Sequence, residues 1–153
     1  MADRILAPIE DVGLERLSEI HDLSFPQAWS AADLVELMSG GASGLVLSEA
    51  SSVAGFLLWR IAADEAEILT VAVEPDHRRK GAGRLLLQGA IHVLADAGVD
   101  RVFLEVAEDN LAAIRLYGSA GFVVVGRRKG YYRRDSLPVD AQVLQLKLNT
   151  EGH

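Results

Sequence analysis

Apolar residues recur along this chain at two spacings, one typical of helices and one typical of strands. Early in the chain, leucine and isoleucine return every three residues over Val12 to His21, which predicts an amphipathic helix. Ser30 is placed to cap a further helical run over residues 31–38, which Gly40-Gly41 ends. Short apolar runs between polar turns predict four strands, at residues 4–6, 44–48, 53–61 and 67–73.

The second half of the chain combines two helical runs with further strands. A long helix over Gly83 to Ala97 is expected to end at Gly98, and Asn110 is placed to cap a helix over residues 111–120. The order β-α-α-β-β-β-α-β-α-β-β predicts a mixed α/β fold with one parallel crossover through the long helix. The remaining strands are expected at residues 101–106, 122–128 and 141–148, the last two as a hairpin around a longer loop.

Composition limits the class of protein. The chain has 153 residues, half of them hydrophobic, so we expect one ordered domain over residues 1–153. It has no cysteine, which excludes disulfides, thiolate nucleophiles and cysteine-ligated zinc. No apolar run approaches the ~18 residues of a membrane span, and the N-terminus lacks a signal-peptide pattern, so a cytoplasmic protein without a membrane partner is expected. The four histidines have no metal-like spacing; we expect surface residues and no metal site at His21, His77, His92 and His153.

The net charge of −7 is unevenly distributed along the chain. Residues 1–74 carry a balance of −10, whereas residues 75–153 carry +3. Such a chain could hold a polyanionic ligand on its second half and attract a cationic partner to its first. A solvated surface with uneven charge is the alternative interpretation.

The segment from Arg78 to Arg84 is the strongest candidate for ligand binding. It places four basic side chains and two glycines between an apolar strand and the start of the long helix, where unpaired backbone N–H groups favour an anion. It matches neither a Walker loop nor a dinucleotide fingerprint. The remaining interpretations are a pyrophosphate site or a plain helix start with solvated arginines. The candidate contacts are Arg78, Arg79, Gly81, Ala82, Gly83 and Arg84.

These motifs resemble a known family. Arg78-x-x-Gly81-x-Gly83, after a strand that ends in Val71-Ala72-Val73, is similar to the acetyl-coenzyme A signature of the GCN5-related N-acetyltransferases (GNAT). The string from Leu104 through Gly121-Phe122, followed by Tyr131-Tyr132, resembles the ribosomal-protein alanine N-acetyltransferases of RimI type within that superfamily. The resemblance implies acetyl-CoA as co-substrate. It also implies a single GNAT domain with about four helices and a mixed, mostly antiparallel sheet of about six to seven strands.

The resemblance also implies catalytic and cofactor roles, beside simpler interpretations of the same residues. Glu105 would be the general base, directly or through water; an isolated glutamate on a strand could instead pair with an arginine such as Arg127. Tyr117 would bind the coenzyme sulfur and protonate the leaving thiolate, or it is only a core aromatic. Asn110 would hold the pantetheine arm in addition to capping its helix. Backbone N–H groups of Val71, Ala72 and Val73 would meet the acetyl carbonyl if a bulge leaves them unpaired.

The acceptor side is less regular. The resemblance assigns Trp29, Tyr131 and Tyr132 to acceptor binding, but the spacing Phe25-Pro26-Gln27-Ala28-Trp29 and the loop over residues 133–138 depart from the family pattern. The basic and aromatic run over residues 127–134 could also be an exposed hairpin tip; nucleic acid is a third and less favoured partner. The expected reaction is acetylation of a protein N-terminal amine, by implication the N-terminal alanine of a small-subunit ribosomal protein. Alternatives are a GNAT enzyme for a small amine, such as a polyamine or amino sugar, and a non-catalytic coenzyme A-binding module.

Overall fold

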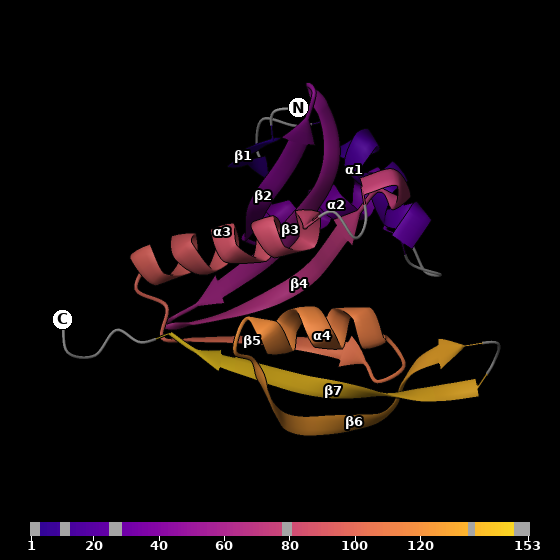
Figure 1. Cartoon of the computed structure of the whole chain (residues 1–153), viewed down its shortest axis with the longest axis vertical. Helices are drawn as coiled ribbons and strands as arrows, with labels where there is room; N and C mark the ends of the chain where they lie inside the picture. The colour runs from indigo at the N-terminus through magenta and orange to yellow at the C-terminus, as the bar shows by residue number, and fades with distance from the viewer. Residues whose placement is uncertain (1–3, 10–12, 25–28, 78–80, 135–136, 149–153) are drawn as a thin grey trace.

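The computed structural model describes residues 4–9, 13–24, 29–77, 81–134 and 137–148 (Figure 1). Its elements follow the predicted order, and most strands are longer than the sequence suggested because the strands extend into the turns that join them. The elements are β1 (Arg4–Pro8), α1 (Leu14–Ser24), α2 (Ala31–Ser39), β2 (Ala42–Glu49), β3 (Ser52–Ala62), β4 (Glu65–Val73), the short 3-10 helix η2 (Pro75–His77), α3 (Ala82–Asp96), β5 (Arg101–Ala107), α4 (Leu111–Ser119), β6 (Val123–Arg134) and β7 (Leu137–Lys147).

The seven strands form one sheet in the order β1-β2-β3-β4-β5-β7-β6, and every neighbouring pair except β4 and β5 is antiparallel. The parallel pair is short, since it joins only Glu65 to Arg101, Ala66 to Val102 and Glu67 to Phe103. Beyond these residues the two strands separate, as Figure 1 shows. The sheet therefore opens along the second half of β4.

Helices cover both faces of the sheet. On one face α3 and α4 bury a cluster that includes Leu57, Leu86 and Leu104. On the other face α1 and α2 bury a second cluster that includes Leu17, Leu34 and Phe56. Because neighbouring residues of a strand point to opposite faces, the continuous apolar run of β3 supplies both clusters. Burying apolar side chains on both sides is the main stabilising contribution to this arrangement.

The predicted cap at Ser30 and the predicted helix end at Gly98 are confirmed. Ser30 Oγ accepts the N–H of Asp33 at 3.1 Å, and Asp33 Oδ2 accepts the N–H of Ser30 at 2.9 Å, which forms a capping box for α2. Gly98 follows α3 with a φ of +84°, a left-handed conformation that glycine adopts without strain. Among the described residues, no helix is both long and apolar enough to cross a membrane.

Sequence-based expectations were wrong at His21, in the C-terminal hairpin and in the first helix, which continues to Ser24 rather than ending at His21. His21 is not a surface residue, since only 3% of it is exposed, in the core beneath Trp29. The strand predicted to end at Arg128 continues as β6 to Arg134, because two register shifts against β7 absorb the extra residues. At the second shift, Gly130 has a φ of +61° and donates its N–H to Asp140 Oδ1 at 2.9 Å.

Candidate functional site

The open edge of β4 begins at a β-bulge. Leu58 of β3 pairs with Thr70 and Trp59 pairs with Ile68, so Leu69 is the extra residue. Across this bulge the direction of the side chains changes: Ile68 packs in the cluster under α3, and Val71 and Val73 pack against the same cluster. Residues 71–73, predicted to meet an acetyl carbonyl, therefore lie on the stretch of β4 that has no pairing with β5.

The predicted anion site lies at the start of α3. Gly81 has a φ of +82° and offers no side chain to the first N–H groups of the helix, so these groups have no capping side chain among the described residues. Gly83 packs closely on α4, since a Cβ there would lie 3.3 Å from Leu116 Cδ2. Arg84 is exposed and Ala82 is buried. Arg78 and Arg79 lie outside the described residues.

Helix α4 holds two of the predicted residues. Asn110 is its N-cap, with Oδ1 accepting the N–H of Ala113 at 3.2 Å. Tyr117 is 7% exposed and packs edge-on against Phe122, with ring centroids 5.7 Å apart. Burial raises the pKa of the Tyr117 hydroxyl above its ordinary value, and nearby Tyr132 adds to this effect. Tyr117 thus keeps its proton at neutral pH, as a proton donor must.

Glu105 lies on β5 and faces away from α3 and α4. Its neighbours Leu104 and Val106 are buried in the cluster beneath those helices, so Glu105 projects from the other face of the sheet. Its Oε1 accepts a hydrogen bond from Arg128 Nη1 at 2.6 Å. The glutamate is thus paired with an arginine, but the partner is Arg128 rather than Arg127.

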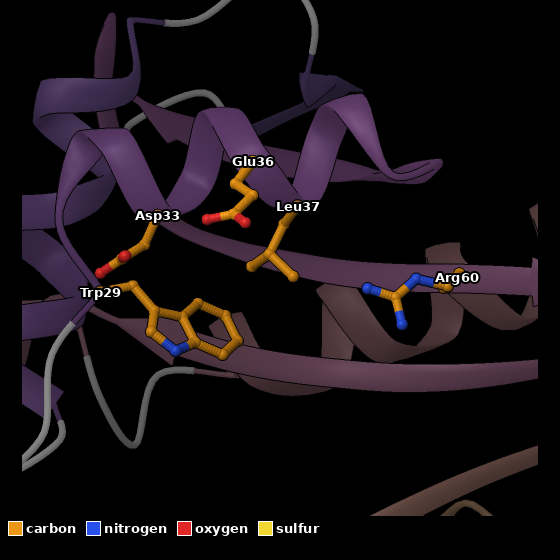
Figure 2. A pocket seen from close by; sticks show the side chains of 5 residues that line it. All are labelled: Trp29, Asp33, Glu36, Leu37 and Arg60. Atoms are coloured by element: carbon orange, nitrogen blue, oxygen red, sulfur yellow. The ribbon is translucent and has the colours of Figure 1, made fainter.

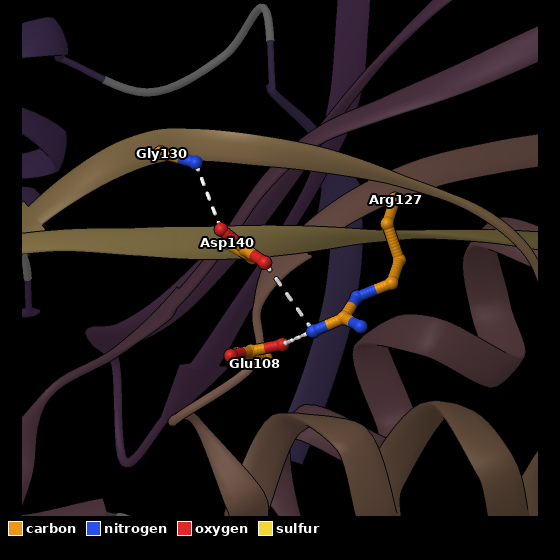
Figure 3. Close-up of polar contacts among 4 residues, drawn as sticks. All are labelled: Glu108, Arg127, Gly130 and Asp140. Atoms are coloured by element: carbon orange, nitrogen blue, oxygen red, sulfur yellow. Dashed lines mark hydrogen bonds and ion pairs between the residues drawn. The ribbon is translucent and has the colours of Figure 1, made fainter.

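The register of the C-terminal hairpin explains this partner. Arg128 is opposite Ala141, which is opposite Ala107, two residues beyond Glu105 on the same face. Arg127 is one residue earlier and therefore points to the other face. There it binds Glu108 and, at 3.3 Å, Asp140 Oδ2 (Figure 3).

The two predicted tyrosines of β6 also gather at Glu105. The Arg128 guanidinium lies 4.5 Å from the ring centroid of Tyr131, in a cation–π arrangement. Burial, followed by the charge of Glu105, raises the pKa of Tyr131. The Tyr132 hydroxyl lies 3.5 Å from the carbonyl oxygen of Glu105. The tyrosines expected to contact an acceptor are therefore beside the residue expected to be the base.

Trp29 lies further along the same side of the sheet. Its backbone N–H donates to His21 Nδ1 at 3.0 Å, and the two rings stack with centroids 4.4 Å apart. This burial lowers the pKa of His21 to about 4, so the imidazole is neutral and can accept the hydrogen bond. Sequence reasoning selected Trp29 but missed the histidine that positions it.

A pocket of about 430 Å³ opens beside Trp29. Figure 2 shows its lining, which is Trp29, Asp33, Glu36, Leu37 and Arg60. One feature of the sequence could have indicated this pocket. Arg60 is the only lysine or arginine between Arg16 and Arg78, and it stands at the end of an apolar strand.

Comparison with known proteins identifies the class. The model of the acetyltransferase (GNAT) family matches residues 14–122. The chain belongs to this family and is an N-acetyltransferase.

Individual relatives are more specific. The chain is 30% identical to the ribosomal protein bS18-alanine N-acetyltransferase of Escherichia coli K12 over 144 residues, 94% of this chain and 97% of that protein. It is 35% identical to the enzyme of the same name from Haemophilus influenzae over 132 residues, 86% and 90% of the two chains. These relatives support an N-terminal acetyltransferase function.

Solved structures agree with this assignment. The ribosomal-protein-S18-alanine N-acetyltransferase from Escherichia coli superimposes with a TM-score of 0.90 at 29% identity, and the match covers 99% of each chain. Arabidopsis thaliana NAA60 in complex with acetyl-CoA has a TM-score of 0.84 at 23% identity over 96% of this chain and 99% of that one. At that identity the second likeness supports the fold alone.

Proposed function

We propose that this protein transfers an acetyl group from acetyl-CoA to the α-amine of a protein N-terminus, with the N-terminal alanine of a ribosomal protein as first candidate. The observation that carries the proposal is the placement of Glu105 and Tyr117 about β5. Glu105 projects from one face of this strand, whereas Tyr117 packs with its neighbours on the other face. A proton acceptor and a proton donor thus flank the strand from which β4 separates.

Three features of the chain fit acetyl-CoA, which supplies the activated acyl group as a thioester. The start of α3, with Gly81, Ala82, Gly83 and Arg84, offers backbone N–H groups to a pyrophosphate, and Arg78 and Arg79 would add charge. The stretch Val71–Val73 after the bulge offers backbone groups to a carbonyl oxygen. Asn110 would reach the pantetheine arm from the start of α4.

The contact between Arg128 and Glu105 suggests how the acceptor amine enters. An N-terminal ammonium carries the same charge as the guanidinium and can replace it on the carboxylate. Glu105, directly or through water, then takes a proton from the amine as its nitrogen attacks the acyl carbon. The N–C bond forms, the C–S bond breaks, and Tyr117 gives its proton to the departing sulfur. The second proton that the ammonium loses on becoming an amide passes, directly or through water, to the Tyr117 phenolate, and Glu105 releases its own proton to solvent. Tyr131 and Tyr132 would contact the acceptor backbone, and Trp29 would lie along its path.

Titration of released thiol tests this function. The protein is mixed with acetyl-CoA and an alanine-led peptide, and in parallel with a polyamine or an amino sugar. We expect thiol release with the peptide. The peptide should gain the mass of one acetyl group, and this group should block N-terminal sequencing. Release only with small amines would favour a small-molecule acetyltransferase, and no release with any amine would favour a non-catalytic coenzyme A-binding module.

A further inference from the structure

The pocket beside Trp29 combines one positive and two negative side chains with an aromatic ring. Glu36 is exposed on α2, and Asp33 lies one helical turn before it on the same side. Asp33 uses Oδ2 in the capping box of α2. The carboxylate of Glu36 has no ion pair within the described part of the chain and is available to a cation.

Arg60 lies at the other end of the pocket and has an unused donor. Its Nε is buried and has no hydrogen-bond partner among the described residues. An N–H without a partner is unfavourable when it is buried, but this atom is closed to solvent. The part of Arg60 that faces the pocket is the end of the guanidinium, as Figure 2 shows. In Figure 2 Leu37 separates the guanidinium from Asp33, so a cation at the α2 end does not meet Arg60 directly.

The pocket lies on the same face of the sheet as Glu105. Arg60 follows Leu58 by two residues and therefore shares its face, under α1 and α2. Arg60 is paired with Glu67 of β4, and Glu67 with Phe103 of β5, two residues before Glu105. The hydrogen bond to Glu105 is the main cause of the raised pKa of Arg128, and burial is the main cause for Tyr131; the charge of Glu67 adds a smaller part to both, so Glu67 lies near the Glu105 cluster.

This path has a definite length. Two strand spacings of about 4.8 Å and two residues of about 3.3 Å along β5 place Glu105 and Arg60 about 12 Å apart at their backbones. An extended peptide rises about 3.3 Å per residue, so an acceptor whose amine lies at Glu105 brings roughly its third to fifth residue to the pocket.

We propose that the pocket lined by Trp29, Asp33, Glu36, Leu37 and Arg60 is a specificity subsite that binds an arginine or lysine side chain of the acceptor. The inference rests on the proposed function and deepens it. The cation pairs with Glu36 and lies over the indole face that is not stacked on His21. The guanidinium end of Arg60 donates to a backbone carbonyl oxygen of the same acceptor segment. The pocket has two carboxylates, those of Asp33 and Glu36, and one guanidinium, that of Arg60. It also belongs to residues 1–74, which carry a net charge of −10, so it favours a basic side chain over an acidic one.

A peptide panel tests the subsite. Each peptide of the panel begins with alanine, has no other charged side chain and carries one arginine, placed at the second, third, fourth, fifth or sixth position. A matched set carries glutamine in place of the arginine. We expect kcat/KM to be about tenfold higher for arginine at one or two positions near the third to fifth, through a lower KM. Glu36→Gln should reduce this preference to about twofold or less.

Two further variants separate charge from structure. Glu36→Arg should reverse the preference towards a peptide with glutamate at the same position. Glu19→Gln removes the same charge from an exposed residue of α1 that does not line the pocket, and the arginine preference should remain. Arg60→Gln should lower kcat/KM alike for arginine and glutamine peptides.

The possible failures are distinguishable. Acetylation with equal kcat/KM for arginine and glutamine at every position, or a preference that survives Glu36→Gln, overturns the subsite and leaves the proposed function intact. Failure to acetylate any peptide overturns both.

Discussion

Replacing Tyr117 by phenylalanine removes one oxygen atom from the centre of the proposed mechanism. The ring can keep its place, because Tyr117 packs against Phe122 and the core through its carbon atoms. Within the described part of the chain, its hydroxyl makes no hydrogen bond. The folded state therefore loses little, and we expect the free energy of unfolding to change by less than about 1 kcal/mol.

The effect on the reaction should be much larger. A positioned general acid accelerates a reaction by about 10²–10⁴-fold, which corresponds to about 2.7–5.4 kcal/mol of activation free energy. Because burial raises the pKa of the Tyr117 hydroxyl, the wild-type enzyme keeps this proton throughout the neutral range, and kcat should not decline up to about pH 9 through loss of this proton.

The assay compares kcat by thiol release with the affinity for coenzyme A by calorimetry. Tyr117→Phe should lower kcat by about two orders of magnitude or more, while the dissociation constant for coenzyme A stays within about threefold. Tyr131→Phe makes the same chemical change on an exposed ring and should raise KM for the peptide instead. A Tyr117→Phe enzyme with wild-type kcat would refute the assignment of the acid.

Five further substitutions probe the base, its arginine, the buried histidine and the space around two glycines. Glu105→Gln should lower kcat by about 10²-fold or more, and full retention of kcat would exclude Glu105 as base. Arg128→Gln removes the cation that occupies this carboxylate, so steady-state kinetics should show a lower KM for the acceptor amine. The pKa of His21 is about 4 in the folded state and 6.5 unfolded, so its contribution to stability is full above pH 6.5 and declines towards pH 4; melting curves of His21→Gln should lack this decline. Gly44→Ala places a Cβ 2.0 Å from the Leu57 carbonyl oxygen and should destabilise by about 1–3 kcal/mol or more in urea titration, whereas Gly118→Ala has open space in a helix and should stabilise by about 0.5–1 kcal/mol.

Local patterns were sufficient to predict most of the fold. The spacing of apolar residues, together with Ser30, Asn110 and Gly98, located the helices because capping depends on residues within one turn. The segment that starts α3 was predicted as an anion site for the same reason, since the chemistry of a helix start resides in adjacent residues. Strand ends were less accurate because each depends on a partner strand far away in sequence.

Pairing between distant segments determined the rest of the site. A single extra residue at Leu69 reverses which side chains of β4 face α3, and no pattern within β4 shows it. A one-residue difference in register against β7 places Arg128, and not Arg127, on Glu105. His21 is buried because Trp29, which lies outside α1, stacks on its ring.

The sequence by itself determined the order of the elements, the glycine-rich start of α3 that is predicted to bind an anion, and the residue types proposed for acyl transfer. Only the tertiary structure decided which of these residues meet, because a strand exchanges its two faces with every one-residue shift in pairing. The pocket between α2 and Arg60 has the same origin. Its lining comes from Trp29 and helix α2 on one side and from Arg60 of β3 on the other. Their contact depends on how the helix lies on the sheet.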